Sequence, residues 1–175
     1  MIRHKLSGVG AAMITPFTAD GRIDYEALAS TVDYVIEGGA DYIVALGTTA
    51  ETPTLYMPER AVIAMFISNH IAGRVPLVIG VGGNSTSEVL DQLREFDLRR
   101  ADAILSVTPY YNKPSQEGLY QHFRTVSEHS PVPVILYNIP GRAGVNMSDE
   151  TTLRIARDFG NVIGVKAVSY THLTL

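Results

Sequence analysis

Short apolar runs recur along the chain at intervals of roughly thirty residues, which is the length of one β-strand plus one helix. Most of these runs do not alternate polar with apolar residues, as is typical of parallel strands that are buried on both faces. The runs are Val9–Ile14, Tyr42–Leu46, Leu77–Val81, Ala103–Val107, Val134–Tyr137 and Val162–Val165. The repeat predicts an α/β fold built from successive β/α units.

The stretches between the runs carry helix signals. Asp24, Ser115 and Ser148 are suited to cap helix N-termini, and Pro58 suits a first turn. Ser85-Thr86-Ser87-Glu88 has the pattern of a capping box. We therefore predict helices over Tyr25–Glu37, Glu59–Ala72, Ser85 to about Arg99, Gln116–Ser130, and Ser148 to about Phe159.

Composition narrows the class of protein. The chain has 175 residues, of which 46% are hydrophobic and 18% charged, an ordinary balance for one globular domain. The formal net charge is -4 and no run of Lys or Arg occurs, which argues against nucleic-acid or membrane partners. The absence of cysteine excludes disulfides. The apolar run after Lys5 is broken by glycines and too short for a signal peptide or a membrane span, so we expect a cytoplasmic protein.

Polar residues follow nearly every predicted strand. The segments are Thr15, Gly47–Glu51, Gly82–Asn84, Thr108–Asn112, Tyr137-Asn138 and Lys166. An open doubly wound sheet would concentrate such residues at one crevice, whereas barrels build their sites from the carboxyl ends of several strands. The distribution therefore favours a (β/α)8 TIM barrel.

Lys166 ends an apolar run, so its side chain starts from an apolar wall. Loss of hydration there favours the neutral amine, which is a nucleophile for carbonyl groups. The alternative is a lysine that extends from the strand end into solvent. The histidines form no metal-ligand spacing and the glycines no phosphate-binding loop, so we predict no metal and no nucleotide cofactor.

Six other side chains have both a chemical and a structural interpretation. Tyr137 could relay protons or be an ordinary core tyrosine. Thr48 and Thr49 could hold a small carboxylate or form an ordinary turn. Arg142 could bind a carboxylate in a bidentate manner or lie solvated in its loop. Tyr110-Tyr111 could be a packed surface pair or an interface anchor.

Four segments of the chain resemble a known family. Gly47–Glu51 resembles its GTTGE segment, and Val107–Leu119 resembles its YYNKPxQEG segment. Tyr137–Gly144 resembles YNxPxRTG, and Ile163–Lys166 resembles the strand that ends in a Schiff-base lysine. The resemblance, from about Gly8 to Lys166, is to the dihydrodipicolinate synthase / N-acetylneuraminate lyase superfamily.

The resemblance implies a reaction and a role for each matching residue. Lys166 would form an imine with pyruvate, Tyr137 would shuttle protons, and Thr48 would link Tyr137 to Tyr111, which reaches into a neighbouring subunit's site. Thr48 and Thr49 would hold the pyruvate carboxylate, and Arg142 the carboxylate of L-aspartate 4-semialdehyde. The product would be 4-hydroxy-tetrahydrodipicolinate, on the route to diaminopimelate and lysine. No cofactor is implied, because the lysine imine is the electron sink, and family members are commonly homotetramers built as dimers of dimers.

The resemblance also implies an effector site and a truncation. Asn84, Glu88 and Tyr110 match positions that line the lysine site in lysine-inhibited relatives. Met57 and Arg60 stand where some of those relatives have histidines, and Arg60 adds positive charge near a cationic ligand, so we expect weak inhibition by lysine. Residues 1–166 would be an incomplete barrel domain of about six strands and five helices, and residues 167–175, His172 included, a tail that departs from the family.

Two other functions stay open. N-acetylneuraminate lyase or another pyruvate-dependent aldolase is the nearest enzyme, although that branch typically has Ser-Thr in place of Thr48-Thr49 and lacks the equivalent of Arg142. The other alternative is a catalytically inactive barrel fragment that binds partners through its exposed edges.

Overall fold

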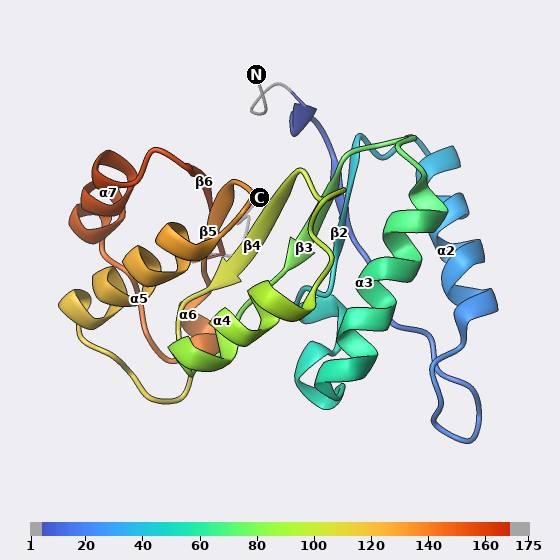
Figure 1. The fold of residues 1–175 in the computed structure, drawn as a ribbon, viewed down its shortest axis with the longest axis horizontal. Coiled ribbons are helices and arrows are strands. Elements are labelled where there is room, and N and C mark those ends of the chain that lie inside the picture. Colours follow the sequence, from blue (N-terminus) through green and yellow to red (C-terminus); the bar gives the residue numbers. More distant parts are fainter. Residues whose placement is uncertain (1–4, 169–175) are drawn as a thin grey trace, which may run out of the picture. The chain divides into compact units, whose positions relative to one another are not determined.

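The computed structural model describes residues 5–168 (Figure 1). These residues form two compact units, one of residues 5–80 with 94–103 and one of residues 81–93 with 104–168. We call them the first and the second unit. Residues 169–175, which make up most of the predicted tail and include His172, lie outside the described residues.

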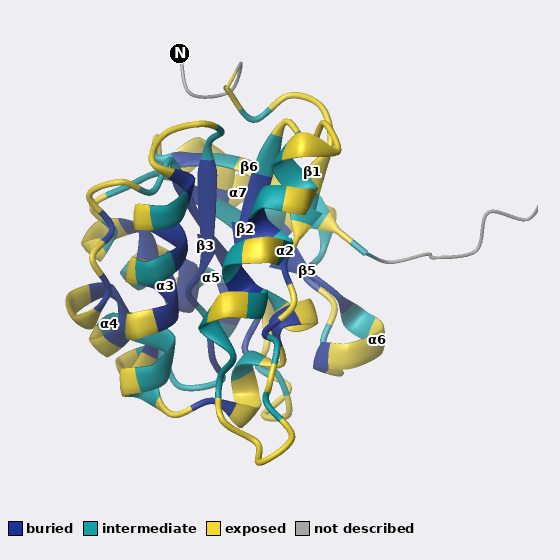
Figure 2. Cartoon of the chain, turned by 90° about the vertical axis from the view of Figure 1, so that its right-hand side faces the viewer, coloured by how far each residue is buried: buried dark blue, intermediate teal, exposed yellow. Residues whose placement is uncertain are grey.

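The first unit contains three parallel strands in chain order, each paired with the next. Its elements are β1 (Gly10–Ala12), α2 (Tyr25–Glu37), β2 (Tyr42–Ala45), the 3-10 turns η1 (Thr48–Ala50) and η2 (Thr52–Thr54), α3 (Met57–Ile71) and β3 (Leu77–Gly80). Figure 2 shows β2 and β3 as buried, while α2 and α3 are exposed on their outer faces. Leu28 of α2 and Ile63 and Ile67 of α3 are fully buried and contribute to the core.

The second unit repeats this arrangement with three more parallel strands. Its elements are α4 (Thr86–Glu95), β4 (Ala103–Val107), α5 (Gln116–His129), β5 (Val134–Asn138), α6 (Pro140–Ala143), α7 (Asp149–Asp158) and β6 (Val162–Ala167). Leu119 and Phe123 of α5 and Ile155 of α7 have no exposed surface. In both units, then, strand and helix alternate, which confirms the predicted α/β class.

Helix starts agree with the capping signals in the sequence. The side chains of Asp24, Ser115 and Ser148 each accept a hydrogen bond from a backbone N–H in the first turn of α2, α5 and α7. At α3 the Glu59 carboxylate accepts from the Tyr56 backbone N–H at 2.8 Å, so this helix begins at Met57, two residues before the predicted start. Local hydrogen bonds therefore set these boundaries.

Two boundaries differ from the prediction in ways that have a physical cause. Helix α4 ends at Glu95 rather than near Arg99, because the Asp97 carboxylate accepts from the Arg99 backbone N–H at 3.2 Å and competes with helical bonding. Strand β6 continues through Lys166 to Ala167, because its pairing with β5 extends that far. Lys166 therefore lies within the strand rather than after it.

No helix among the described residues is both long and apolar enough to cross a membrane.

Candidate active site

Lys166 and Tyr137 lie side by side in the second unit. The register pairs Tyr137 of β5 with Lys166 of β6, so the two side chains leave the same face of the sheet. The Lys166 Nζ is 4.7 Å from the centre of the Tyr137 ring. Tyr137 is 5% exposed and Lys166 half-buried. A primary amine and a phenol thus share one partly desolvated position, where an amine can attack a carbonyl group and a phenol can supply or accept a proton.

Arg142 and Tyr111 are positioned by a common backbone contact. Arg142 is exposed in the short helix α6, directly after β5. The Tyr111 backbone N–H donates to the Ala143 carbonyl of the same helix at 3.1 Å. Tyr111 has a left-handed backbone with φ of 71° and an 85% exposed side chain. The second unit therefore brings the segments of both predicted residues together.

Asn138 fixes the segment that follows α6. Its buried side chain donates to the Asn146 side-chain oxygen at 2.8 Å and to the Met147 carbonyl at 3.4 Å. It also accepts from the Met147 N–H at 3.0 Å. The sequence placed Asn138 at a strand end without a role. Its position at the end of an apolar strand could have indicated this role, because a buried side-chain amide needs hydrogen-bond partners.

Thr48 and Thr49 lie in the first unit, in turn η1 after β2. Both are exposed, whereas Ala50 is buried. The turn is closed by the Ala50 N–H, which donates to the Gly47 carbonyl at 3.1 Å, and by the Glu51 N–H, which donates to the Thr48 carbonyl at 3.1 Å. Neighbouring N–H groups and hydroxyls in such a turn suit a small carboxylate.

The predicted effector residues occupy one region of the second unit. The Asn112 side chain donates to the Asn84 carbonyl at 2.8 Å, and the Asn112 N–H donates to the Tyr110 carbonyl at 2.8 Å. Glu88 lies in the first turn of α4, four residues after Asn84. Asn84 and Tyr110 are thus joined through Asn112, with the carboxylate of Glu88 close by in the chain.

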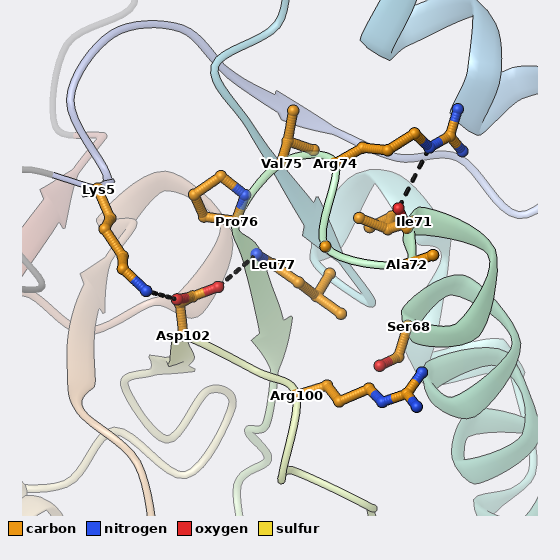
Figure 3. A pocket seen from close by; sticks show the side chains of 11 residues that line it. Lys5, Ser68, Ile71, Ala72, Arg74, Val75, Pro76, Leu77, Arg100 and Asp102 are labelled. Atoms are coloured by element: carbon orange, nitrogen blue, oxygen red, sulfur yellow. Dashed lines mark hydrogen bonds and ion pairs between the residues drawn. The ribbon is translucent and has the colours of Figure 1, made fainter.

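A cavity of about 630 Å³ in the first unit contains none of the predicted residues (Figure 3). It lies at the amino end of β3, where Asp102 accepts from Lys5 at 3.4 Å and from the Leu77 N–H at 3.0 Å. In barrel enzymes this end of the strands serves stability rather than catalysis. Within residues 5–168 no three or more His, Cys, Asp or Glu side chains gather as metal ligands would; the expected absence of a metal stays a prediction.

Comparison with known proteins identifies a family. A sequence model of the dihydrodipicolinate synthetase family matches residues 5–174. The 4-hydroxy-tetrahydrodipicolinate synthase of Parabacteroides distasonis is 55% identical over 164 residues, which cover 94% of this chain and 55% of that protein. The enzyme of Porphyromonas gingivalis is 51% identical over 97% of this chain and 57% of its own length. The chain thus spans little more than half the length of the curated relatives it matches.

Solved structures agree with this comparison. The 4-hydroxy-tetrahydrodipicolinate synthase of Methylacidiphilum fumariolicum matches with a TM-score of 0.91 and 36% identity, covering 95% of this chain and 55% of that one. The dihydrodipicolinate synthase of Acinetobacter baumannii, solved with pyruvate, matches with a TM-score of 0.89 and 42% identity, covering 93% of this chain and 55% of that one. The match confirms the predicted fold class, a (β/α)8 barrel of which the described residues contain six strands.

Proposed function

Because the chain belongs to the dihydrodipicolinate synthetase family, we propose that the protein carrying it is a lyase that condenses pyruvate with L-aspartate 4-semialdehyde to 4-hydroxy-tetrahydrodipicolinate. The observation that carries the proposal is the pair formed by Lys166 and Tyr137, 4.7 Å from the amine nitrogen to the ring centre. An amine at the end of a barrel strand with a phenol beside it is equipped for imine chemistry.

The proposed steps balance without a redox partner. The neutral Lys166 amine attacks the C2 carbonyl carbon of pyruvate, and the carbonyl oxygen leaves as water to give an imine. The imine withdraws electrons, so C3 loses a proton and an enamine forms. The enamine carbon then attacks the aldehyde carbon of the semialdehyde. The aldehyde oxygen takes a proton and becomes a hydroxyl group, while the imine between C2 and Lys166 forms again. The amino group of that substrate finally displaces Lys166 from C2, which closes the ring and frees the enzyme.

Other residues take the roles of binding and proton transfer in this proposal. Tyr137 relays protons to the oxygen that leaves C2 as water, from C3 when the enamine forms, and to the aldehyde oxygen. Thr48 and Thr49 hold the pyruvate carboxylate, and the exposed Arg142 receives the carboxylate of the semialdehyde. No metal or organic cofactor takes part, because the imine itself accepts the electron pair. The proposed reaction belongs to lysine biosynthesis, and we expect it to take place in the cytoplasm.

The experiment that tests this function is imine trapping in the full-length protein that carries this sequence. Incubation with pyruvate and borohydride should reduce the imine and leave a stable adduct on Lys166, identified by peptide mass spectrometry. Lys166→Ala should give no adduct, with Lys113→Ala as a matched control that traps normally. An adduct that persists in Lys166→Ala would remove Lys166 from the mechanism.

A substrate panel separates the synthase from the nearest alternative. N-acetylneuraminate lyases and other pyruvate-dependent aldolases would form the same adduct, so trapping alone does not distinguish them. Thr48-Thr49 and Arg142 favour the synthase. We expect turnover with pyruvate and L-aspartate 4-semialdehyde and none with N-acetylneuraminate. Preferred cleavage of N-acetylneuraminate would contradict the synthase assignment, and a fully inactive full-length protein would favour a binding role.

We also propose that L-lysine is a weak effector that binds around Asn84, Glu88 and Tyr110, because Arg60 adds positive charge near a cationic ligand. The support is the Asn112 side chain, which donates to the Asn84 carbonyl at 2.8 Å and so couples that segment to the loop of Tyr110. A carboxylate such as Glu88 is complementary to the ammonium group of lysine. Binding measured by calorimetry should weaken in Glu88→Gln.

A further inference from the structure

The chain turns sharply where β2 gives way to the Thr48–Thr49 segment. Leu46 follows the last residue of β2 and has a left-handed backbone with φ of 54°. That conformation is unfavourable for a leucine and persists only where the surroundings enforce it. The Leu46 side chain is 3% exposed, so it is anchored in the core of the first unit. A strained residue therefore stands two positions before Thr48.

Gly80 is the neighbour that makes this turn possible. The register of β2 and β3 pairs Ala45 with Ile79, which brings Leu46 opposite Gly80. A Cβ on Gly80 would lie 2.6 Å from the Leu46 carbonyl carbon, closer still to its oxygen, and 3.1 Å from the Gly47 nitrogen. These are backbone atoms, which cannot rotate aside as the end of a side chain would. Only glycine at position 80 lets the Leu46–Gly47 peptide occupy this place.

The far end of the same segment is fastened by a buried hydroxyl. Thr15, 4% exposed after β1, donates from its Oγ1 to the Ala50 carbonyl at 2.8 Å. The hydroxyl of Thr52 likewise donates to the Gly47 carbonyl at 2.9 Å. Thr48 and Thr49 themselves are exposed. The backbone of the turn is thus fixed from Gly80 at one end and from Thr15 at the other.

We propose that Gly80 and Thr15 are positioning residues for the pyruvate carboxylate: they hold the backbone and hydroxyl groups of Thr48 and Thr49 in the geometry that receives it. The inference rests on the proposed function, since it assigns that role to the two threonines. A carboxylate site depends on donors held in place before the ligand arrives. Displacement of the turn therefore weakens pyruvate binding more than it slows later steps.

The experiment compares matched variants of the full-length protein in steady-state assays. Thr15→Val removes the hydroxyl at nearly constant volume, and Thr15→Ser keeps it. Gly80→Ala adds the colliding Cβ, whereas Gly160→Ala is its control, because a Cβ there meets nothing within 4 Å. We expect Thr15→Val and Gly80→Ala to raise the KM for pyruvate at least about tenfold, with the KM for the semialdehyde changed less than about twofold. Thr15→Ser and Gly160→Ala should stay within about twofold of the wild type in both constants.

The outcomes separate this inference from the proposed function. If the wild-type protein forms no imine with pyruvate, the proposed function fails first. If it does, a Thr15→Val variant with an unchanged KM for pyruvate overturns the positioning role, as does a Thr15→Ser variant as impaired as Thr15→Val. Should Gly80→Ala not fold, as judged by circular dichroism, the Thr15 pair still decides the question.

Discussion

Tyr137 is a buried phenol next to the amine of Lys166, and its removal tests the proposed proton relay. Tyr137→Phe keeps the ring and deletes only the hydroxyl. Since general acid–base catalysis contributes a factor of about 10² to 10⁴, we expect the kcat for synthesis to fall at least about a hundredfold. Unfolding temperature, measured alongside, should change little. A variant that turns over at the wild-type rate would contradict the relay.

Arg142 is exposed and carries a planar, permanently charged group suited to bidentate carboxylate contacts. Arg142→Ala should raise the KM for L-aspartate 4-semialdehyde by roughly a hundredfold, the loss of about 2 to 3 kcal/mol of charge-assisted hydrogen bonding. The rate of borohydride trapping with pyruvate alone should stay near that of the wild type. Arg142→Lys keeps the positive charge but cannot make the bidentate contact, so its KM for the semialdehyde should lie between those of the wild type and Arg142→Ala. Equal losses in trapping and synthesis would instead indicate a folding role.

His122 couples the stability of the second unit to pH. It is 4% exposed in α5, and its Nδ1 shares a hydrogen bond of 2.8 Å with the Thr86 hydroxyl. Burial lowers the pKa of His122 from 6.5 to about 4. Between about pH 6.5 and pH 4, His122 is therefore protonated in the unfolded chain but neutral in the folded one. The free energy of unfolding decreases as pH falls through this window.

We expect the free energy of unfolding to fall by about 3 kcal/mol between pH 6.5 and pH 4 because of His122, and not to depend on His122 above about pH 6.5. His122→Gln keeps a hydrogen-bonding group for Thr86 but cannot titrate, so its free energy of unfolding should depend less on pH between 6.5 and 4. Denaturant unfolding at a series of pH values measures both slopes. Parallel curves for the two proteins would show that His122 is not the titrating group.

At the scale of elements, the segment that follows α6 depends on one buried amide, that of Asn138 at the end of β5. Asn138 makes three hydrogen bonds to residues 146 and 147. Asn138→Leu leaves the Met147 N–H without its acceptor and should lower the free energy of unfolding by about 1 to 3 kcal/mol. Because the same segment follows the helix of Arg142, the KM for the semialdehyde should rise as well. Asn138→Asp keeps the acceptor for the Met147 N–H but puts an oxygen where the amide donates to Asn146 and Met147, so it should be destabilised as well. If Asn138→Leu keeps the wild-type free energy of unfolding and KM, these hydrogen bonds do not hold the segment.

Long elements were predictable from the sequence because their signals are local. The bounds of α2 and β4 match the prediction, since Asp24 caps the helix and the apolar run Ala103–Val107 is unbroken. Helix α6 has four residues, too few to show a helical period, and it was missed. The left-handed Leu46 was also missed, because a leucine gives no turn signal and its conformation depends on the space that Gly80 leaves for the Leu46–Gly47 peptide.

The candidate site was predictable in its residues but not in its geometry. The sequence identified Lys166 and Tyr137 as strand-end residues. It could not provide the register that pairs them, because pairing depends on strands 24 residues apart in the chain that meet only in the folded sheet. The roles of Asn138 and Thr15 are likewise not visible in the sequence, because each acts through a hydrogen bond that only the folded chain defines.

At the scale of the whole molecule, we expect the full-length protein to be a homotetramer in which Tyr111 completes the site of a neighbouring subunit. The side chain is 85% exposed, while its backbone is held to α6 in a left-handed conformation. A large tyrosine held out into solvent is typical of an interface anchor. Light scattering should give a mass of four chains. Tyr111→Phe should keep that mass while lowering turnover at least about tenfold.

Mixed oligomers test whether Tyr111 acts across the interface. Lys166→Ala and Tyr111→Phe should each be impaired alone. In a dimer that contains one subunit of each kind, the site with an intact Lys166 receives an intact Tyr111 from the other subunit. Random reassembly after mild denaturation makes about half of the dimers mixed, with one complete site each, so activity should recover to about a quarter of the wild type. If Tyr111 serves the site of its own subunit, no mixed dimer contains a complete site, and the mixture will show only the sum of its two impaired components.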